Sequence, residues 1–527
     1  DDGAVPSVRT FSTSEDGLVN LQPSSGTFST VSVREGQAIM NVPLYGSQGL
    51  LKTGAGTLLL NADSVYPGTT RVEGGTLRVA GKFTSPRVEL ANSPVFELFS
   101  NSTLNFHAAN AAKTAITGIG TFRKSGTGLV QLSNNGMGCI ISLQAGSLLD
   151  VTGGTLKNGT FTNSDWTQNF SSLALATGTT LDVWNGGPVR VDSLTGAGAI
   201  TNGLNGGTTS LTLGVANGSG NFTGTVRAVG LTVIKTGTGT QTLSGPAASI
   251  AGTQVSNGKL IVSGSGINAL GAVTASGTGQ LRLGWQLAAN STSTGASSFT
   301  AGSVAANTNA VIDVSLNPSG SAVALNDVFW TQPRSWTVLT ATSVSGAITL
   351  GTVTADAAGR AASDYGTFTV QTTGTSASLT WTPHPILVWR TQKFGANASN
   401  LSFSGNLADP DNDGMANLIE FVIGGQPDPA IAGANSSHLS PAAAVAGGDF
   451  VFTFRRTTVS VTQPGIGIKV EYGSELTGWQ TAVQGVNGVT TSVVTGIESG
   501  VDAVSVRIPR SLVPGPKFFA RLNVTLP

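Results

Sequence analysis

The sequence is poor in cysteine, histidine and charge, and each scarcity excludes a class of protein or site. Cys139 is the single cysteine among 527 residues, which rules out an internal disulfide and a cysteine-based zinc site. The three histidines, His107, His384 and His438, are widely spread along the chain, so a Ser-His-Asp triad has little support. We expect Cys139 to be a small buried or half-buried residue.

Charged residues make up 10% of the chain, and the 27 basic and 27 acidic residues give no net charge. A neutral chain argues against nucleic acid as a partner, because nucleic acid binding depends on clustered lysine and arginine. No apolar run reaches the 18 or so residues that a membrane-spanning helix needs. A hydrophobic fraction of 39% without net charge favours a folded chain over a disordered one.

Glycine is abundant, with 71 residues, and part of it belongs to an internal repeat. Three segments beginning at Leu51, Arg123 and Ile234 share lysine, then threonine or serine, then Gly-x-Gly, a short strand, a turn, and a second strand opened by glycine. Short strands with glycine corners, repeated every 20–50 residues, are typical of a parallel β-helix.

The second strand of each copy alternates with a period of two. In "TLRV" Leu77 and Val79 face one way, and in "KLIV" Leu260 and Val262 take the same places. The middle copy fits less well, because Asp150 stands where Val79 would be. The pattern predicts inward-facing aliphatic residues stacked from rung to rung.

The segments "KTGAGTLLL", "VYPGTTRV" and "GGTLRV" of the first copy, and "NGSGNFTGTVRAVGLTVIKTGTGTQTLSG" (217–245), resemble the autotransporter-associated β-strand repeat of Gram-negative surface proteins. The resemblance implies a right-handed β-solenoid outside the cell, and it does not imply any one enzyme activity. The first residue is Asp1 rather than methionine, so we expect a signal peptide to have been removed from a secreted or cell-surface protein.

After Pro383 and Pro385 the sequence pattern changes, which marks a predicted domain boundary. "NLIEFVIGG" (417–425) is the best candidate for a helix, with Gly424 as its stop signal. Five strand-like runs follow: "DFVFTFRR", "IGIKVEYGS", "TSVVTGIES", "AVSVRIPR" and "KFFARLNVTLP". This order of Asp-rich loop, helix and strands resembles a C-terminal module common on repeat-rich secreted bacterial proteins.

We therefore predict an all-β protein, in which a right-handed parallel β-helix is followed by a small antiparallel β-sandwich with one short helix. The segment 27–44 is a candidate donor strand or first rung for head-to-tail association. The predicted parts are 1–50, an N-terminal cap or donor segment; 51–267, solenoid repeats; 268–382, final rungs and cap; and 383–527, a calcium-loop and sandwich module.

The stretch "DPDNDGMANLIE" (409–420) matches the EF-hand loop pattern. Oxygen ligands without histidine or cysteine favour Ca²⁺ over a transition metal, and we expect the ion to pin the junction before the sandwich. The competing interpretation is an Asx-rich turn that caps the following helix. The predicted metal ligands are Asp409, Asp411, Asp413, Met415 through its carbonyl, Asn417 and Glu420.

No catalytic cluster stands out in the sequence. Residues 193–312 contain no aspartate or glutamate. Asp182 and Asp192 are a candidate carboxylate pair, although turn capping is the commoner use. Trp166 and Trp184 are candidates for stacking on sugars, although packing in the core is more common.

We expect a non-enzymatic extracellular structural protein, a subunit of a surface fibre or an adhesin-like stalk that associates head to tail. Its expected partners are further copies of the chain, extracellular polysaccharide, and a host or neighbouring cell surface. The alternatives are a secreted carbohydrate-active enzyme or glycan-binding β-helix, and a protease-resistant passenger that only displays the C-terminal module.

Overall fold

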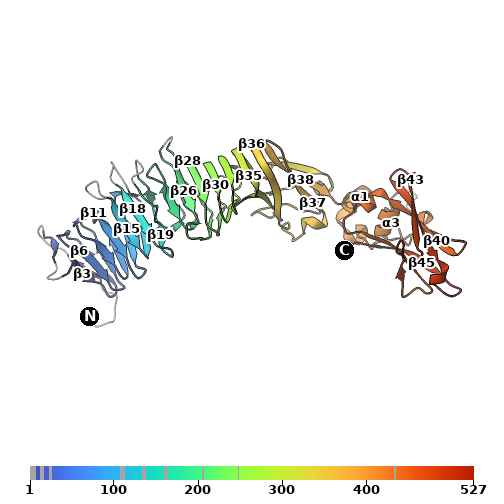
Figure 1. Cartoon of the computed structure of the whole chain (residues 1–527), viewed down its shortest axis with the longest axis horizontal. Coiled ribbons are helices and arrows are strands. Elements are labelled where there is room, and N and C mark those ends of the chain that lie inside the picture. Colours follow the sequence, from blue (N-terminus) through green and yellow to red (C-terminus); the bar gives the residue numbers. More distant parts are fainter. Residues whose placement is uncertain are drawn as a thin grey trace.

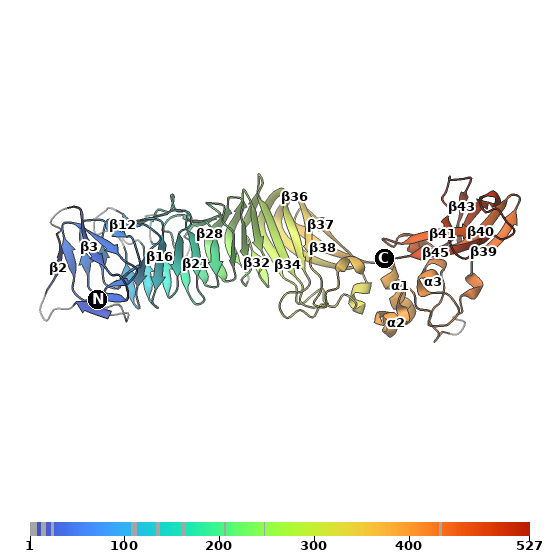
Figure 2. The same cartoon turned by 90° about the horizontal axis from the view of Figure 1, so that it is seen from below.

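The computed structural model describes residues 8–11, 17–22, 26–106, 113–132, 138–159, 164–204, 207–246, 248–431 and 435–526. The chain forms a long stack of β-strands that ends in a separate module of antiparallel strands and short helices (Figures 1 and 2). The N-terminal strands and the module lie at opposite ends of the molecule, as the two views agree.

The solenoid is built from parallel sheets that run along its length. Near the N-terminus each turn places one strand in each of three sheets. A six-stranded sheet contains β3 (Phe28–Ser32), β6 (Gly49–Thr53), β9 (Thr70–Val72), β12 (Arg87–Leu90), β15 (Thr114–Gly118) and β18 (Cys139–Leu143). A four-stranded sheet contains β2 (Val19–Leu21), β5 (Leu44–Gly46), β8 (Ser64–Val65) and β11 (Phe83–Thr84).

A 28-stranded sheet continues to the end of the solenoid. Its strands are β1 (Val8–Phe11), β4 (Gln37–Met40), β7 (Thr57–Leu60), β10 (Thr76–Val79), β13 (Val95–Phe99), β14 (Thr103–Asn105), β16 (Thr121–Ser125), β17 (Leu129–Gln131), β19 (Leu148–Val151), β20 (Thr155–Lys157), β21 (Ser172–Leu175), β22 (Thr180–Asp182), β23 (Val189–Val191), β24 (Leu194–Gly196), β25 (Ala199–Thr201), β26 (Thr209–Leu213), β27 (Gly220–Phe222), β28 (Thr225–Lys235), β29 (Thr240–Leu243), β30 (Ser249–Val255), β31 (Lys259–Val262), β32 (Ile267–Ala269), β33 (Ala272–Ala275), β34 (Gln280–Gln286), β35 (Ser298–Ser315), β36 (Arg334–Val353), β37 (Gly366–Thr372) and β38 (Ser376–Pro383).

The core of the solenoid is a ladder of buried apolar side chains, because every second residue of a strand points inward. The pairing registers stack seven of them in one line. They are Leu58, Leu77, Phe96, Phe122, Leu149, Leu173 and Leu194, and all are buried. The inward alternation predicted from the sequence is confirmed.

The outward positions of the same strands carry a ladder of alternating charge. Arg78, Glu97, Arg123 and Asp150 are neighbours on successive rungs. The Arg78 Nε lies 3.4 Å from Glu97 Oε1, and the Arg123 Nε lies 2.9 Å from Asp150 Oδ2. Stacking places identical positions close together, so opposite signs on successive rungs avoid the repulsion that like charges would produce.

The expectation that Asp150 takes the place of Val79 is wrong. The register aligns Val79 with Leu98, Lys124 and Val151, so Val151 is the inward residue and Asp150 faces outward. The middle copy has one more residue between its glycine and the inward positions than the first copy has, and this moves the strand by one position.

The glycines of the repeat are required by the corners. At Gly237 φ is +61°, a left-handed conformation that glycine adopts without cost. A Cβ atom on Gly239 would lie 2.1 Å from the carbonyl oxygen of Gly218 on the preceding rung. The Gly-x-Gly pattern therefore supplies one turn geometry and one close backbone approach at each corner.

The last rungs are wider and end in a cluster of tryptophans. The strands β35 and β36 have 18 and 20 residues, and β36 and β37 each pair antiparallel with β38. Trp330 and Trp381 pack edge to face with ring centroids 5.1 Å apart, and the Trp381 Nε1 donates to the Trp330 carbonyl at 2.8 Å. This cluster closes the apolar interior where the parallel ladder stops.

The module begins with helix α1 (Pro385–Phe394), directly after β38. It contains two antiparallel sheets, as predicted, and the five strand-like runs of the sequence are strands β40, β41, β43, β44 and β45. One sheet has the order β39 (Ala442–Ala446), β40 (Asp449–Thr457), β44 (Val501–Pro509) and β43 (Thr490–Glu498). The other has the order β42 (Gln480–Thr481), β41 (Gly467–Gly473) and β45 (Phe519–Thr525).

The predicted helix is α3 (Asn417–Ile423), which ends at Gly424 in a left-handed conformation. Three further α-helices of the module lie outside the sequence prediction: α1, α2 (Leu401–Ser404) and α4 (Thr458–Val461). In the part of the chain that the structure describes, the short 3₁₀ helices are η1 (Val328–Thr331), η2 (Ala362–Asp364), η3 (Gly395–Ser399), η4 (Ser437–Leu439) and η5 (Arg510–Leu512).

The candidate donor segment 27–44 is part of the solenoid wall. Strand β4 pairs with β1 on one side and with β7 on the other, so its edges are already occupied. Strand β3 is the outermost described strand of the six-stranded sheet. Of the described strands in this segment, only β3 therefore keeps an edge that another strand could join. Among the described residues, no helix has the length and apolar character needed to cross a membrane.

Candidate functional site

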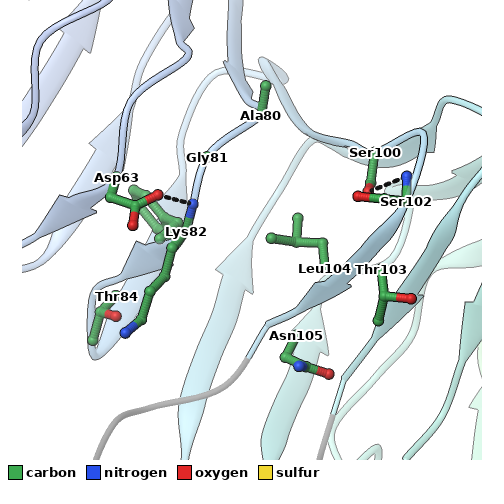
Figure 3. Close-up of a pocket in the computed structure, with 11 residues that line it drawn as sticks. Asp63, Ala80, Gly81, Lys82, Thr84, Ser100, Ser102, Thr103, Leu104 and Asn105 are labelled. Atoms are coloured by element: carbon green, nitrogen blue, oxygen red, sulfur yellow. Dashed lines mark hydrogen bonds between the residues drawn. The ribbon is translucent and has the colours of Figure 1, made fainter.

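A groove opens on the side of the solenoid where the four-stranded sheet ends at β11. It encloses about 650 Å³, and Figure 3 shows its polar lining, including Asp63, Lys82 and Thr103. The carboxylate of Asp63 accepts a hydrogen bond from the Lys82 backbone nitrogen at 2.8 Å. Glycoside hydrolysis ordinarily uses two carboxylates, and the described lining of this groove holds one.

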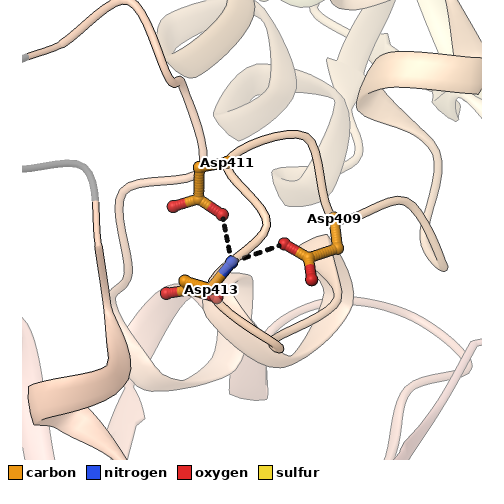
Figure 4. Close-up of side chains that lie close together, drawn as sticks. All are labelled: Asp409, Asp411 and Asp413. Carbon is orange, nitrogen blue, oxygen red and sulfur yellow. Dashed lines mark hydrogen bonds between the residues drawn. The ribbon is translucent and has the colours of Figure 1, made fainter.

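The loop before α3 brings three carboxylates together. Asp409, Asp411 and Asp413 each offer an oxygen atom within 4.8 Å of the other two, and Figure 4 shows them converging. The Asp413 backbone nitrogen donates to Asp409 Oδ1 at 3.2 Å and to Asp411 Oδ1 at 3.3 Å. Left-handed backbone at Asn412 and Gly414 turns the loop sharply enough to permit this.

Glu420 reaches the same region from α3. Its side chain is fully buried, and Ser436 connects it to the loop. The Ser436 hydroxyl donates to Glu420 Oε1 at 2.7 Å, while the Ser436 backbone nitrogen donates to Asp413 Oδ2 at 2.5 Å. The cluster therefore joins the loop, the helix and the segment that leads into the sandwich.

The remaining two predicted ligands have other contacts. The Asn417 Nδ2 donates to the carbonyl oxygens of Phe403 and Gly405 at 2.9 and 2.8 Å, so this amide anchors the end of α2. The Met415 backbone nitrogen donates to Asp413 Oδ1 at 2.8 Å, and its side chain packs against the module core.

The carboxylates do not cap α3 directly. The N-cap residue of α3 is Ala416, which provides no side-chain hydrogen bond. The pKa of Glu420 is raised to about 7, mainly by burial and in smaller part by the charges of Asp411, Asp413 and Asp409, against the opposing effect of the Ser436 hydrogen bond. Burial, the hydrogen bond to Asp409 and the neighbouring carboxylates also raise the pKa of Asp411. A site that disfavours its own negative charge in this way is suited to a cation.

The lysines of the repeat have a role that the sequence prediction missed. The Lys52 Nζ donates to the carbonyl oxygens of Thr53, Gly54 and Gly74, at 2.9, 2.8 and 3.0 Å. Lys124 and Lys235 also bind corner carbonyls, and all three side chains are buried. Their recurrence just before each Gly-x-Gly was the available signal. Each lysine holds a corner of the solenoid closed.

Burial lowers the pKa of Lys52 and Lys124 to about 8. Both ammonium groups therefore remain charged at neutral pH and keep the three hydrogen atoms that the corner carbonyls accept.

The candidate carboxylate pair is separated into two turn caps. Asp182 Oδ1 accepts from the backbone nitrogens of Trp184 and Gly203, and Asp192 Oδ1 accepts from those of Ala216 and Gly218. Turn capping, the commoner use expected for these two residues, is what the structure shows.

The aromatic and cysteine candidates also have structural roles, because each is buried or covered by a neighbouring side chain. Trp166 is buried and donates to Asn158 Oδ1 at 2.7 Å, and Cys139 is buried in β18, where burial raises its pKa. The Lys157 Nζ lies 3.4 Å from the ring centroid of Trp184, so that ring face is covered. His107 is outside the described residues, while His384 and His438 lie on separate elements.

The family model described as "Passenger-associated-transport-repeat" matches residues 50–79 and 233–262, which are the first and third copies of the repeat. Over 216 residues the chain is 29% identical to "Adhesin BmaC autotransporter" of Brucella suis biovar 1 (strain 1330). That alignment covers 40% of this chain and 6% of the adhesin, so the chain spans a small part of this relative's length. No solved structure matches the chain. Both matched segments lie in the wall of the solenoid, so the chain contains two repeats of this family and is similar to autotransporter-associated β-repeat proteins.

Proposed function

We propose that this chain is an adhesin-like passenger at the surface of a Gram-negative bacterium. The observation that carries the proposal is the position of both family repeats within one continuous parallel ladder. Such a ladder gives a long scaffold whose outward side chains can be presented away from the cell. The similarity to a bacterial autotransporter adhesin points in the same direction.

We propose a non-enzymatic role, which the use of the polar residues supports. The buried lysines bind corner carbonyls, and Asp182 and Asp192 bind backbone nitrogens. These groups therefore act within the scaffold, whereas acid–base catalysis requires a group within reach of substrate.

Adhesion is tested with latex beads coated with the whole chain and with an unrelated β-solenoid of similar charge. We expect the coated beads to attach to host cells or to a neighbouring bacterial surface more strongly than the control beads. Equal attachment on every surface tested would contradict the proposal.

We further propose that copies associate head to tail. The open edge of β3 lies near one end of the molecule, and β43, at the other end, is an edge strand in which all nine residues are exposed. Apart from Glu498 at its end, β43 carries no charge. Such an exposed edge can accept a further strand, whereas a lysine there blocks pairing.

Electron micrographs test this association directly. Val494 of β43 is 61% exposed and Val445 of β39 is 60% exposed, so Val445→Lys is a matched control for Val494→Lys. We expect filaments from the native chain and from Val445→Lys, but not from Val494→Lys. Monodisperse native monomers, or filaments from both variants alike, would contradict head-to-tail pairing through β43.

Glycan binding is a second candidate function, favoured by the hydroxyl, amide, carboxylate and ammonium groups of the groove beside β11. A polysaccharide panel separates it from enzymatic action. Bound but unaltered oligosaccharide supports a binding site, while new reducing ends or unsaturated products indicate catalysis.

A further inference from the structure

We propose that Asp409, Asp411, Asp413 and Glu420 bind one calcium ion, which fastens the loop before α3 to the segment that enters the sandwich. This inference concerns the C-terminal module and is independent of the adhesin-like function proposed above.

The first observation is the supply of oxygen atoms. Both oxygens of Asp409 accept backbone hydrogen bonds, from Asp413 and from Gly414, which fix that carboxylate in place. Asp411 uses Oδ1 in the same way, but its buried Oδ2 has no hydrogen-bond partner. A carboxylate oxygen that accepts one hydrogen bond keeps a second lone pair for a metal. The loop is therefore held in a shape that leaves its oxygens free to ligate.

The second observation is independent of the loop. Glu420 belongs to α3, has no solvent exposure, and its Oε2 has no hydrogen-bond partner. The Ser436 hydroxyl satisfies Oε1, and the same residue binds Asp413, so the free Oε2 belongs to a carboxylate held beside the cluster. The neighbouring cation Lys393 donates to Gln426 Oε1. A buried carboxylate with an unpaired oxygen is costly unless a cation joins it.

The donor set selects the type of ion. Four carboxylates with no histidine or cysteine suit a hard divalent cation, and Ca²⁺ accepts six to eight oxygen ligands with irregular geometry. The Met415 main-chain carbonyl, at the seventh position of the loop, is the expected fifth donor, and water would complete the shell. Asn417 remains a candidate donor, because its Nδ2 donates to backbone carbonyls near α2 while its buried Oδ1, the atom that could ligate, has no hydrogen-bond partner.

Ser436 determines what binding would do to the structure. It hydrogen-bonds both Asp413 and Glu420, so an ion between these carboxylates fixes the position of the chain as it leaves the helix for the sandwich. The mutual repulsion of four clustered carboxylates would be relieved at the same step.

The test is calcium titration of the whole chain by calorimetry after treatment with chelator. We expect one Ca²⁺ per chain, with a dissociation constant of about 10⁻⁴–10⁻³ M or tighter, the range of extracellular calcium modules, and weaker binding of Mg²⁺. Asp413→Asn and Glu420→Gln should each weaken binding by about tenfold or more, as loss of a charged ligand does. Glu420→Gln retains an oxygen that can accept from Ser436, so it removes charge with little change of shape.

Asp428→Asn is the matched control, because Asp428 lies in the same part of the chain but caps the Ala430 nitrogen outside the cluster. Circular dichroism spectra of each variant check that it is folded. The proposal is overturned if the folded native chain binds no calcium up to about 10 mM, well above the weakest extracellular sites, or if Asp428→Asn weakens binding as much as Asp413→Asn.

Discussion

At the scale of single residues, the buried lysines show how a nearly charge-free interior uses charge. Each ammonium donates to two or more corner carbonyls, so one cation ties together several backbone acceptors of the corner. The sequence revealed the repetition of Lys52, Lys124 and Lys235, but their burial follows only from the way successive rungs close over the corner.

We expect Lys52→Met to destabilise the solenoid by about 3 kcal/mol, because methionine fills the space but removes the donor to the part-buried carbonyls of Gly54 and Gly74. Lys259→Met is the control, since Lys259 is exposed on β31. Chemical denaturation of both variants measures the difference. Equal midpoints for the two variants would contradict the role assigned to Lys52.

Glu420 makes the stability of the metal-free module depend on pH. Its pKa is about 7 in the folded chain, against an ordinary value of 4.5. Between these values the folded state holds a proton that the unfolded chain has released. The contribution of Glu420 to the free energy of unfolding is therefore fully present below pH 4.5 and falls by about 3 kcal/mol as pH rises through 7.

Thermal unfolding in chelator, at a series of pH values, checks this prediction. We expect Glu420→Gln to lose this part of the pH dependence, because the amide does not titrate. If the native chain and Glu420→Gln vary with pH in parallel, the raised pKa of Glu420 is not the cause.

At the scale of elements, the pairing register between strands determines which residues face the core, and the local sequence pattern does not fix that register. The position of Asp150 was misjudged because glycine spacing does not specify which residue of the next strand faces inward. Helix α1 was missed because Pro383 and Pro385 were interpreted as breaks, although proline is compatible with the first turn of a helix, where Pro385 stands. Helix α3 and five module strands were predictable, since their apolar periods are strong.

The convergence of the acidic loop was predictable in part, because it depends on a local sequence pattern. The spacing of Asp409, Asp411 and Asp413 is local, so the sequence indicated their convergence, which the structure shows. Ser436 lies far along the chain from the loop, and only the tertiary fold places it between Asp413 and Glu420.

The alternating charge ladder predicts an effect of charge reversal. Arg123→Glu would place three acidic residues in a row with Glu97 and Asp150. We expect a loss of about 1–2 kcal/mol, smaller at high salt, because like charges on adjacent strands repel. Arg227→Glu is the control, since its rung neighbours Thr201 and Ser249 are uncharged. Unfolding at low and high salt measures both effects, and equal losses would contradict the ladder.

At the scale of the whole molecule, the parallel ladder links the N-terminal strands to the tryptophan cluster and then to the antiparallel module (Figure 2). Each rung is stabilised mainly by its neighbours, so length is added without a larger core. An elongated scaffold of this kind suits presentation at a surface better than enclosure of a substrate. The adhesin-like proposal rests on that architecture together with the family repeats.

The most direct test of that proposal is attachment of intact bacterial cells that display the chain, compared with cells of the same strain from which it is deleted. We predict that antibodies label the chain on unbroken cells and that deletion reduces attachment to a host or neighbouring surface. Clear surface labelling with unchanged attachment after deletion would contradict the account.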